Sequence, residues 1–318
     1  MKKELNRLKT LELEVQKAIK QVARNKDVKS YIQETEHVYS LLRKGACRYI
    51  TGEKRDDGIG IAQKLVGEGY RVSLEYIGEN TMTVEESVKV KEEFLHIIED
   101  FSRHSMQQTV SLDLSHIGLT IDPKIAKKNI IEIAEKASLH NITIMISMEE
   151  SAKTDAILSI YKHVSKNFSN VGITIQAHLY RSREDIKELL TYPGKIRVVK
   201  GAYKEPTDIA MPRSNELTEN YLHIVELLIE ADHPVSIATY DKNILDELEQ
   251  RNFFQHPNVE IEMLYGIQPN LLNELKNKGY PCKIYLTYGN DWFLYICHRI
   301  AEHPENLYQF ITDIVSSK

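Results

Sequence analysis

The polar residues best suited to chemistry lie near the C-terminus, in a stretch that we interpret as strand, turn and helix. Tyr295, His298, Arg299 and Glu302 recur at spacings of three and four residues, so a helix would carry them on one face. Tyr285 lies in the β-branched and aromatic run before the turn. A guanidinium, a carboxylate, an imidazole and two phenols together could hold a small charged ligand. A solvated helix face is the alternative that the spacing leaves open.

The elements that would position these residues alternate along most of the chain. From Arg71 onward, β-branched and aromatic runs alternate with helical patterns. The predicted strands are 71–77, 109–114, 142–148, 172–179, 196–202, 235–239, 259–264 and 283–288. This alternation predicts a parallel α/β sheet, and the count of eight strands favours a closed, TIM-type (β/α)8 barrel over an open doubly wound sheet.

Helical patterns fill the intervals between these runs. They cover 84–104, 122–139, 152–168, 183–190, 215–231, 242–251 and 269–278. Residues from about 3 to 44 precede any strand and predict two further helices, the first with an apolar stripe. The stripe would pack on the barrel or form a surface for a partner helix. We therefore expect an N-terminal helical extension, 1–69, and a barrel, 70–318.

Composition excludes several classes of function. The 318 residues carry a net charge of -5 and no long basic run, so we expect no nucleic-acid partner. No apolar stretch reaches the roughly 18 residues of a membrane span, and the N-terminus lacks a signal-type apolar core. The 3 cysteines are too few for a disulfide or zinc framework, and the histidines lack metal-ligand spacing. These features predict a cytoplasmic protein without a metal site.

In a (β/α)8 barrel, functional groups gather at the carboxyl ends of the strands. Polar residues at the predicted ends include Glu75, Glu79, Asp113, Ser147, Glu149, Gln176, His178, Arg197, Lys200, Tyr203, Thr239, Tyr240, Asp241, Glu262, Tyr265 and Tyr285. Because side chains alternate along a strand, roughly half of these would face the surrounding helices. We interpret the consecutive Glu149 and Glu150 as a helix start rather than a catalytic carboxylate pair.

Several segments, in the same order along the chain, resemble the flavin-dependent proline dehydrogenases of the monofunctional bacterial type. They are 77–80, 176–181, 197–203, 264–266 and 285–302. The resemblance runs from about residue 70 to 306. It implies a distorted (β/α)8 barrel that binds FAD non-covalently, with the last helix over the flavin and the substrate held between the two.

The resemblance also implies the residues that contact FAD. They are Gln176, Arg197, Val199, Gly201, Thr239 and Tyr240, the last at a position where the family commonly has histidine. An amide and a guanidinium suit the polar edge of a flavin, and glycine permits a close approach of the backbone.

On the substrate side, the resemblance implies catalytic positions at Tyr285, Arg299 and Glu302. The further positions that it implies around the substrate are Asp113, Ser147, Tyr203, Leu264, Tyr295 and His298. In the family, cations hold the carboxylate of the amino acid and the glutamate faces its amine. The implied reaction is oxidation of L-proline to pyrroline-5-carboxylate in proline catabolism, by hydride transfer to flavin N5, with a quinone as the usual electron acceptor.

Three of these positions depart from the family pattern. Asp113 replaces a lysine, Ser147 replaces an aspartate, and His298 replaces the first of two arginines. Arg299 is then the cation predicted to hold a carboxylate, and a milder change puts Glu75 where aspartate is usual. Two alternatives therefore stay open: a flavin oxidoreductase of the same fold acting on another cyclic amine or imino acid, and a non-catalytic barrel that binds FAD or partners. Peripheral contact with a membrane is compatible with each.

Overall fold

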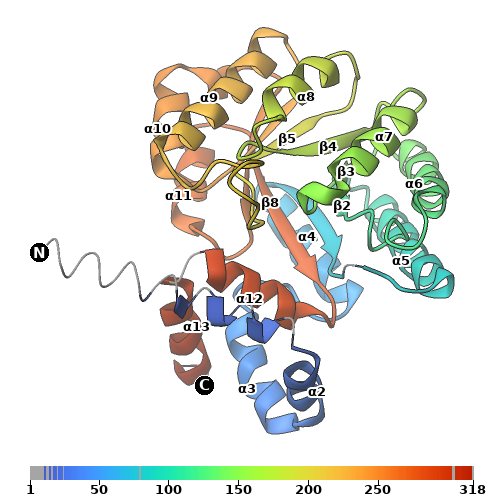
Figure 1. Ribbon diagram of the computed structural model, residues 1–318, viewed down its shortest axis with the longest axis vertical. Coiled ribbons are helices and arrows are strands. Elements are labelled where there is room, and N and C mark those ends of the chain that lie inside the picture. The colour runs from blue at the N-terminus through green and yellow to red at the C-terminus, as the bar shows by residue number, and fades with distance from the viewer. Residues whose placement is uncertain are drawn as a thin grey trace, which may run out of the picture.

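Eight parallel strands form a closed barrel in the computed structural model, which describes residues 11, 14–15, 17–19, 21–23, 25–78, 80–302 and 305–316. The strands are β1 (Arg71–Tyr76), β2 (Thr109–Leu112), β3 (Thr143–Ile146), β4 (Val171–Gln176), β5 (Ile196–Val199), β6 (Val235–Ala238), β7 (Val259–Leu264) and β8 (Cys282–Tyr288). Each pairs with its neighbours in chain order, and pairing between β8 and β1 closes the ring. The predicted (β/α)8 barrel is confirmed (Figure 1).

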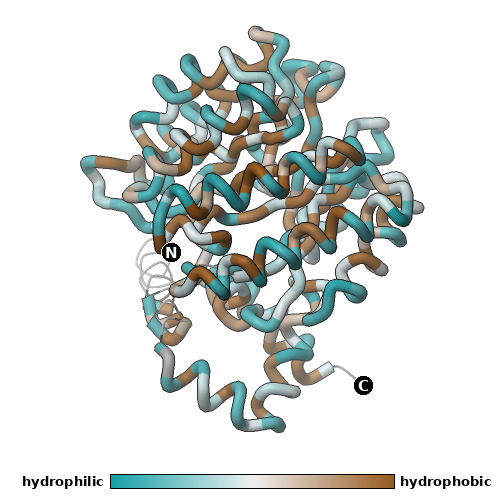
Figure 2. The backbone as a smooth tube through the Cα atoms, turned by 90° about the vertical axis from the view of Figure 1, so that its right-hand side faces the viewer, coloured by the Kyte–Doolittle hydropathy of each residue, from teal (hydrophilic) through white to brown (hydrophobic). Residues whose placement is uncertain are grey.

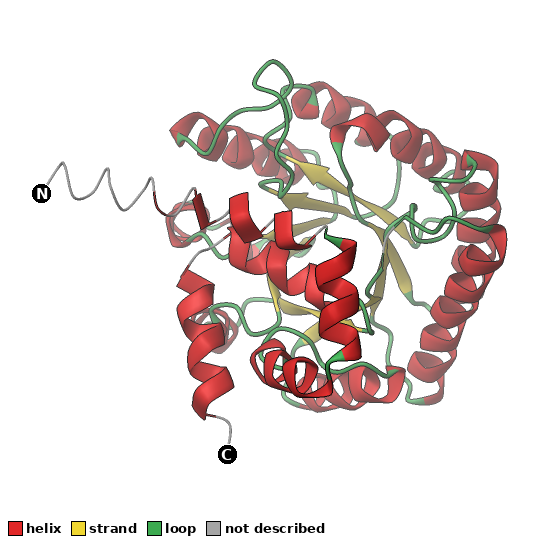
Figure 3. Cartoon of the chain, turned by 60° about the horizontal axis from the view of Figure 1, so that its bottom comes forward, coloured by secondary structure: helices red, strands yellow, loops and turns green. Residues whose placement is uncertain are grey.

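Helices surround the strands on the outside of the barrel (Figure 3). They are α4 (Arg55–Gly67), α5 (Val84–Arg103), α6 (Pro123–Ser138), α7 (Thr154–Val164), α8 (Ser182–Leu189), α9 (Asn215–Glu230), α10 (Lys242–Gln250) and α11 (Pro269–Asn277), with short 3₁₀ turns η1 (Ser151–Lys153) and η2 (Phe253–Gln255). Several of these helices begin at local capping signals. Thr83 and Glu86 form a capping box before α5, and Asp122 caps α6 directly before Pro123.

Several strands end earlier than predicted. β2 ends at Leu112 rather than 114, and β5 ends at Val199 rather than 202. Asp113 and Gly201 therefore lie in the loops that follow these strands. Gly201 has a φ of 108°, a conformation that a β-strand does not use and that favours glycine.

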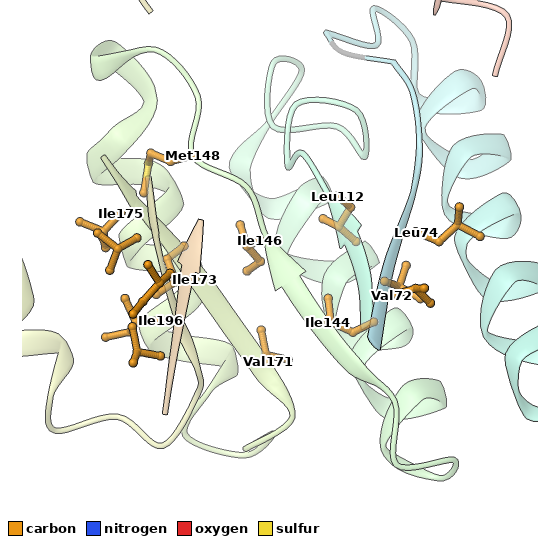
Figure 4. Packing of buried hydrophobic residues seen from close by; sticks show 14 of the residues in the cluster. Val72, Leu74, Leu112, Ile144, Ile146, Met148, Val171, Ile173, Ile175 and Ile196 are labelled. Carbon is orange, nitrogen blue, oxygen red and sulfur yellow. The ribbon is translucent and has the colours of Figure 1, made fainter. Parts of the chain in front are cut away.

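Side-chain alternation along the strands separates an apolar core from a polar barrel interior. Val72 and Leu74 on β1 are fully buried in the main hydrophobic cluster, which Figure 4 shows in part. Leu74 lies against Gly58 of α4, and burial of each such side chain contributes roughly 1.5–3 kcal/mol. Ser73 and Glu75, at the intervening positions, are also buried but fall outside that apolar cluster. Along the helices, hydrophobic and hydrophilic residues alternate correspondingly (Figure 2).

The two ends of the chain meet beside the barrel. Helix α2 (Lys26–Glu34) packs on α3 (Glu36–Ala46), and α3 packs beside α12 (Trp292–Glu302) and α13 (Glu305–Ser316) (Figure 1). The Trp292 indole donates a hydrogen bond to the Tyr39 hydroxyl at 3.0 Å, and Arg48 forms an ion pair with Asp313. A second hydrophobic cluster, which includes Tyr49 and Trp292, joins α3, α12 and α13.

The prediction of two helices before residue 44 was wrong in one respect. The second predicted helix is broken at Thr35, whose extended backbone separates α2 from α3. Residues 1–10 of the first predicted helix lie outside the described residues. Helix α4, within the predicted extension 1–69, packs against β1 and β8, and the boundary at residue 70 stays a prediction.

Candidate active site

A cavity of about 870 Å³ opens at the carboxyl ends of the strands. Its walls come from the strands, from the loops that follow them and from α12. The sequence-predicted residues that line it are Asp113, Ser147, Gln176, Arg197, Val199, Gly201, Tyr203, Thr239, Tyr240, Leu264, Tyr285, Tyr295, His298 and Arg299. Glu302 ends α12, but its side chain and the whole of Glu79 lie outside the described residues. The cavity occupies the face of the barrel where enzymes of this fold place their active sites.

Arg197 of β5 forms the buried floor of this cavity. Its guanidinium donates two hydrogen bonds to Glu262 of β7, at 3.0 and 2.7 Å, and others to Ser111 at 2.8 Å and Ser73 at 3.3 Å. The ring of Tyr285 lies 5.0 Å from the guanidinium carbon. Paired in this way across the barrel, the Arg197 guanidinium is fixed in orientation.

A second cluster of polar and charged side chains fills the barrel interior below Arg197. The Glu260 carboxylate accepts hydrogen bonds from Lys283 at 2.5 Å and forms an ion pair with Lys195 at 2.8 Å. Burial would raise the pKa of Glu260, but the two ammonium groups hold that pKa well below its usual range. Lys283 also donates to Thr109 at 3.0 Å. This cluster lies toward the end of the barrel opposite the cavity and ties neighbouring strands together.

Gln176 is held by the loop that follows β3. Its side-chain nitrogen donates to the backbone carbonyl of Glu149 at 2.9 Å. The fully buried Glu149 carboxylate accepts hydrogen bonds from the Ser115 backbone at 2.9 Å and the Lys153 ammonium at 2.6 Å. The predicted helix start is present, since Glu150 directly precedes η1, but the structural role of Glu149 was missed. Lys153, four residues after Glu149, was the signal in the sequence that could have indicated this ion pair.

On the other side of the cavity, Glu75 of β1 lies near two guanidiniums. Its side chain is 7% exposed. Burial, the largest influence, raises the pKa of Glu75; Arg197 and Arg299 lower it, the Glu149 carboxylate raises it, and the net value is about 7. The Arg299 guanidinium carbon lies 5.1 Å from the ring of Tyr295 one turn earlier in α12. Glu75 was among the polar residues predicted at the strand ends, but its two guanidinium neighbours come from distant elements and were not predicted.

The loop after β5 covers part of the cavity. Arg213 donates a hydrogen bond to the Gly201 carbonyl, and Lys200 forms an ion pair with Asp241 after β6. A Cβ atom at Gly201 would lie 1.6 Å from Nδ1 of His178, so only glycine fits without displacement. The backbone of this loop is therefore fixed close to the cavity.

A family model described as proline dehydrogenase matches residues 59–307 of this chain. The chain belongs to the proline dehydrogenase family. The resemblance inferred from the sequence is thus confirmed. Proline dehydrogenase 1 of Bacillus subtilis strain 168 is 31% identical over 267 residues, covering 83% of this chain and 88% of that protein. Proline dehydrogenase of Deinococcus radiodurans is 31% identical over 268 residues, covering 81% of this chain and 86% of that protein.

Solved structures of proline utilization A share the fold. Proline utilization A from Bdellovibrio bacteriovorus superposes with a TM-score of 0.77 at 18% identity, covering 90% of this chain and 38% of that chain. A mutant of proline utilization A from Bradyrhizobium japonicum gives a TM-score of 0.70 at 16% identity, covering 84% of this chain and 32% of that chain. This chain thus spans well under half of those longer proteins, and at these identities the likeness shows the barrel fold alone.

The described part of this proline dehydrogenase family member has neither a metal-binding cluster nor a membrane-spanning helix. No group of three or more histidine, cysteine, aspartate or glutamate side chains is arranged to hold a metal ion among the described residues. Within the same ranges, every helix is too short or too polar to cross a bilayer.

Proposed function

We propose that this protein is an FAD-dependent oxidoreductase that converts L-proline to pyrroline-5-carboxylate in proline catabolism. The observation that carries the proposal is that one cavity, at the mouth of a proline dehydrogenase-type barrel, is lined by both predicted cofactor residues and predicted substrate residues. We also infer a cytoplasmic location, a quinone as electron acceptor and, at most, peripheral contact with a membrane.

The residues around the cavity fit FAD. Its volume, about 870 Å³, lies toward the upper end of the range for ligand pockets, about 300–1,000 Å³. Arg197 uses Nε and Nη2 for its bonds to described residues, so Nη1 is available to a ligand. Thr174 lines the cavity, and its buried hydroxyl has no hydrogen-bond partner among the described residues. Gln176 and Thr239 would complete the polar contacts. FAD, when bound, supplies the acceptor for the hydride removed from the substrate.

Residues of β8 and α12 would hold the substrate. The Arg299 guanidinium suits the carboxylate of an amino acid, and the rings of Tyr285 and Tyr295 would enclose an apolar pyrrolidine ring. Glu302, one turn beyond Arg299, is our proposed partner of the amine. Closing this pocket against water would strengthen each of these charge contacts.

A second candidate is oxidation of another cyclic amine or imino acid. The observation that favours it is the pair of carboxyl groups, Glu75 and Asp113, that line the cavity together with Arg299. Two like charges 4 Å apart cost about 4 kcal/mol at an effective dielectric of about 20, so an ionised Asp113 would repel the carboxylate of proline. An amine without a carboxylate would avoid that repulsion.

The visible spectrum of the purified protein tests the cofactor, and anaerobic titration tests the substrate. We expect oxidised-flavin absorbance that is released by heat, and bleaching of that absorbance by L-proline. Bleaching by pyrrolidine but not by L-proline would select the second candidate. A colourless protein that takes up no added FAD would overturn both candidates and leave a non-catalytic barrel.

A further inference from the structure

Glu75 is a buried carboxyl group that faces the cavity without a hydrogen-bonding partner in the described part of the chain. It stands at the cavity end of β1, in register with Thr287 of β8. Buried carboxyl groups normally have hydrogen-bond donors or a paired cation in contact, because an unpaired buried charge is costly. A carboxyl that lines a ligand cavity and lacks such a donor is suited to meet a group of the ligand itself.

The charged groups near Glu75 come from several different strands, loops and helices around the cavity. The charged groups that act on Glu75 are Arg197 of β5, Glu149 after β3 and Arg299 of α12. Other titratable and polar groups that line the same cavity are Asp113 after β2, Glu262 of β7, and Tyr285 and Thr287 of β8, the last paired with Glu75 on the neighbouring strand. The two guanidiniums disfavour a third positive charge nearby, so a cationic nitrogen bound here would give up a proton more readily than in water.

We propose that Glu75 accepts the proton of the substrate's ring nitrogen, a role that rests on the proposed function. The substrate would enter as a cyclic secondary ammonium ion. One N–H bond breaks, one O–H bond forms on the Glu75 carboxylate, and the nitrogen keeps the electron pair. No electron leaves the substrate in this step.

The chemistry of the product requires such a step. Oxidation of a cyclic amine gives a carbon–nitrogen double bond, which forms with the nitrogen lone pair. A fully protonated ammonium nitrogen has no lone pair to give. A carboxylate with a pKa of about 7 is ionised and able to accept the proton at neutral pH and above, and it becomes protonated and inactive as the pH falls.

The test is the pH dependence of kcat/KM for L-proline in the FAD-loaded protein and three variants. For the parent we expect an acidic limb, with activity falling below about pH 7. Glu75→Gln should lower kcat/KM at pH 8 by about 100-fold or more, mainly through kcat, and should remove the limb. Glu75→Asp should keep the limb at reduced activity. Asp113→Asn is the matched control, since it removes a different carboxyl from the same cavity and should keep the limb.

A second measurement does not depend on turnover. Infrared difference spectra between acidic and alkaline pH should show a protonated carboxyl band that disappears with an apparent pKa near 7 in the parent and is absent in Glu75→Gln. An active parent whose acidic limb survives Glu75→Gln would overturn the role of Glu75 and leave the proposed function intact. A flavin-loaded parent that oxidises neither L-proline nor pyrrolidine would overturn the proposed function and this role together.

Discussion

Replacing Glu75 with glutamine should stabilise the folded protein at pH 8 and leave its stability nearly unchanged at pH 4. Glutamine has the shape of the protonated carboxyl group but cannot ionise. The parent side chain is 7% exposed, so ionisation in the folded state places a negative charge in a largely buried site. The variant avoids that charge at every pH.

The magnitude follows from the shift in the pKa of Glu75, from its usual value of 4.5 to about 7. Between these values the folded state binds more protons than the unfolded state, so the free energy of unfolding of the parent falls as the pH rises through this window. A difference of about 2.5 between the two pKa values, at about 1.4 kcal/mol for each factor of ten, corresponds to a loss of about 3.5 kcal/mol, which is nearly complete at pH 8. Glu75→Gln should recover most of it.

Urea unfolding followed by circular dichroism at pH 4, 6 and 8 measures this difference. Only parent and variant at the same pH are compared, because other carboxyl groups also titrate in this range. Glu274→Gln, at an exposed position of α11, is the matched control and should give a difference that does not change with pH. An equal effect of Glu75→Gln at pH 4 and pH 8, or destabilisation at pH 8, would refute the reasoning.

Three further outcomes are expected. Glu262→Ala should destabilise the protein by about 3–5 kcal/mol in the same unfolding assay, because it leaves a buried guanidinium without its carboxylate. Gly201→Ala should reduce flavin content, measured from the visible spectrum, since its Cβ would overlap a histidine ring, whereas Gly60→Ala, with nothing within 4 Å, should keep the flavin. Asp113→Lys combined with His298→Arg should raise the rate of flavin bleaching by L-proline, and an unchanged rate would show that these positions do not limit proline binding.

The sequence by itself predicted the order of the strands and helices and hence the barrel. Strand runs such as 259–264 and caps such as Thr83 act over a few residues, and the local pattern therefore contains their signal. It also predicted the face of the barrel at which the candidate residues gather, because parallel strands in a barrel bring all their carboxyl ends to one face. Asp113 and Tyr285, far apart in the chain, could be assigned to the same face by this rule alone.

Only the tertiary structure decided which charges meet. Arg197 and Glu262 are 65 positions apart and form a buried ion pair across the barrel, while Glu75 lies under the influence of Arg197 and Arg299. The break at Thr35 likewise depends on packing, since α3, which begins after it, packs beside α12 and α13 from the other end of the chain. Electrostatic energies depend on distance and burial, and neither quantity exists until the barrel has closed.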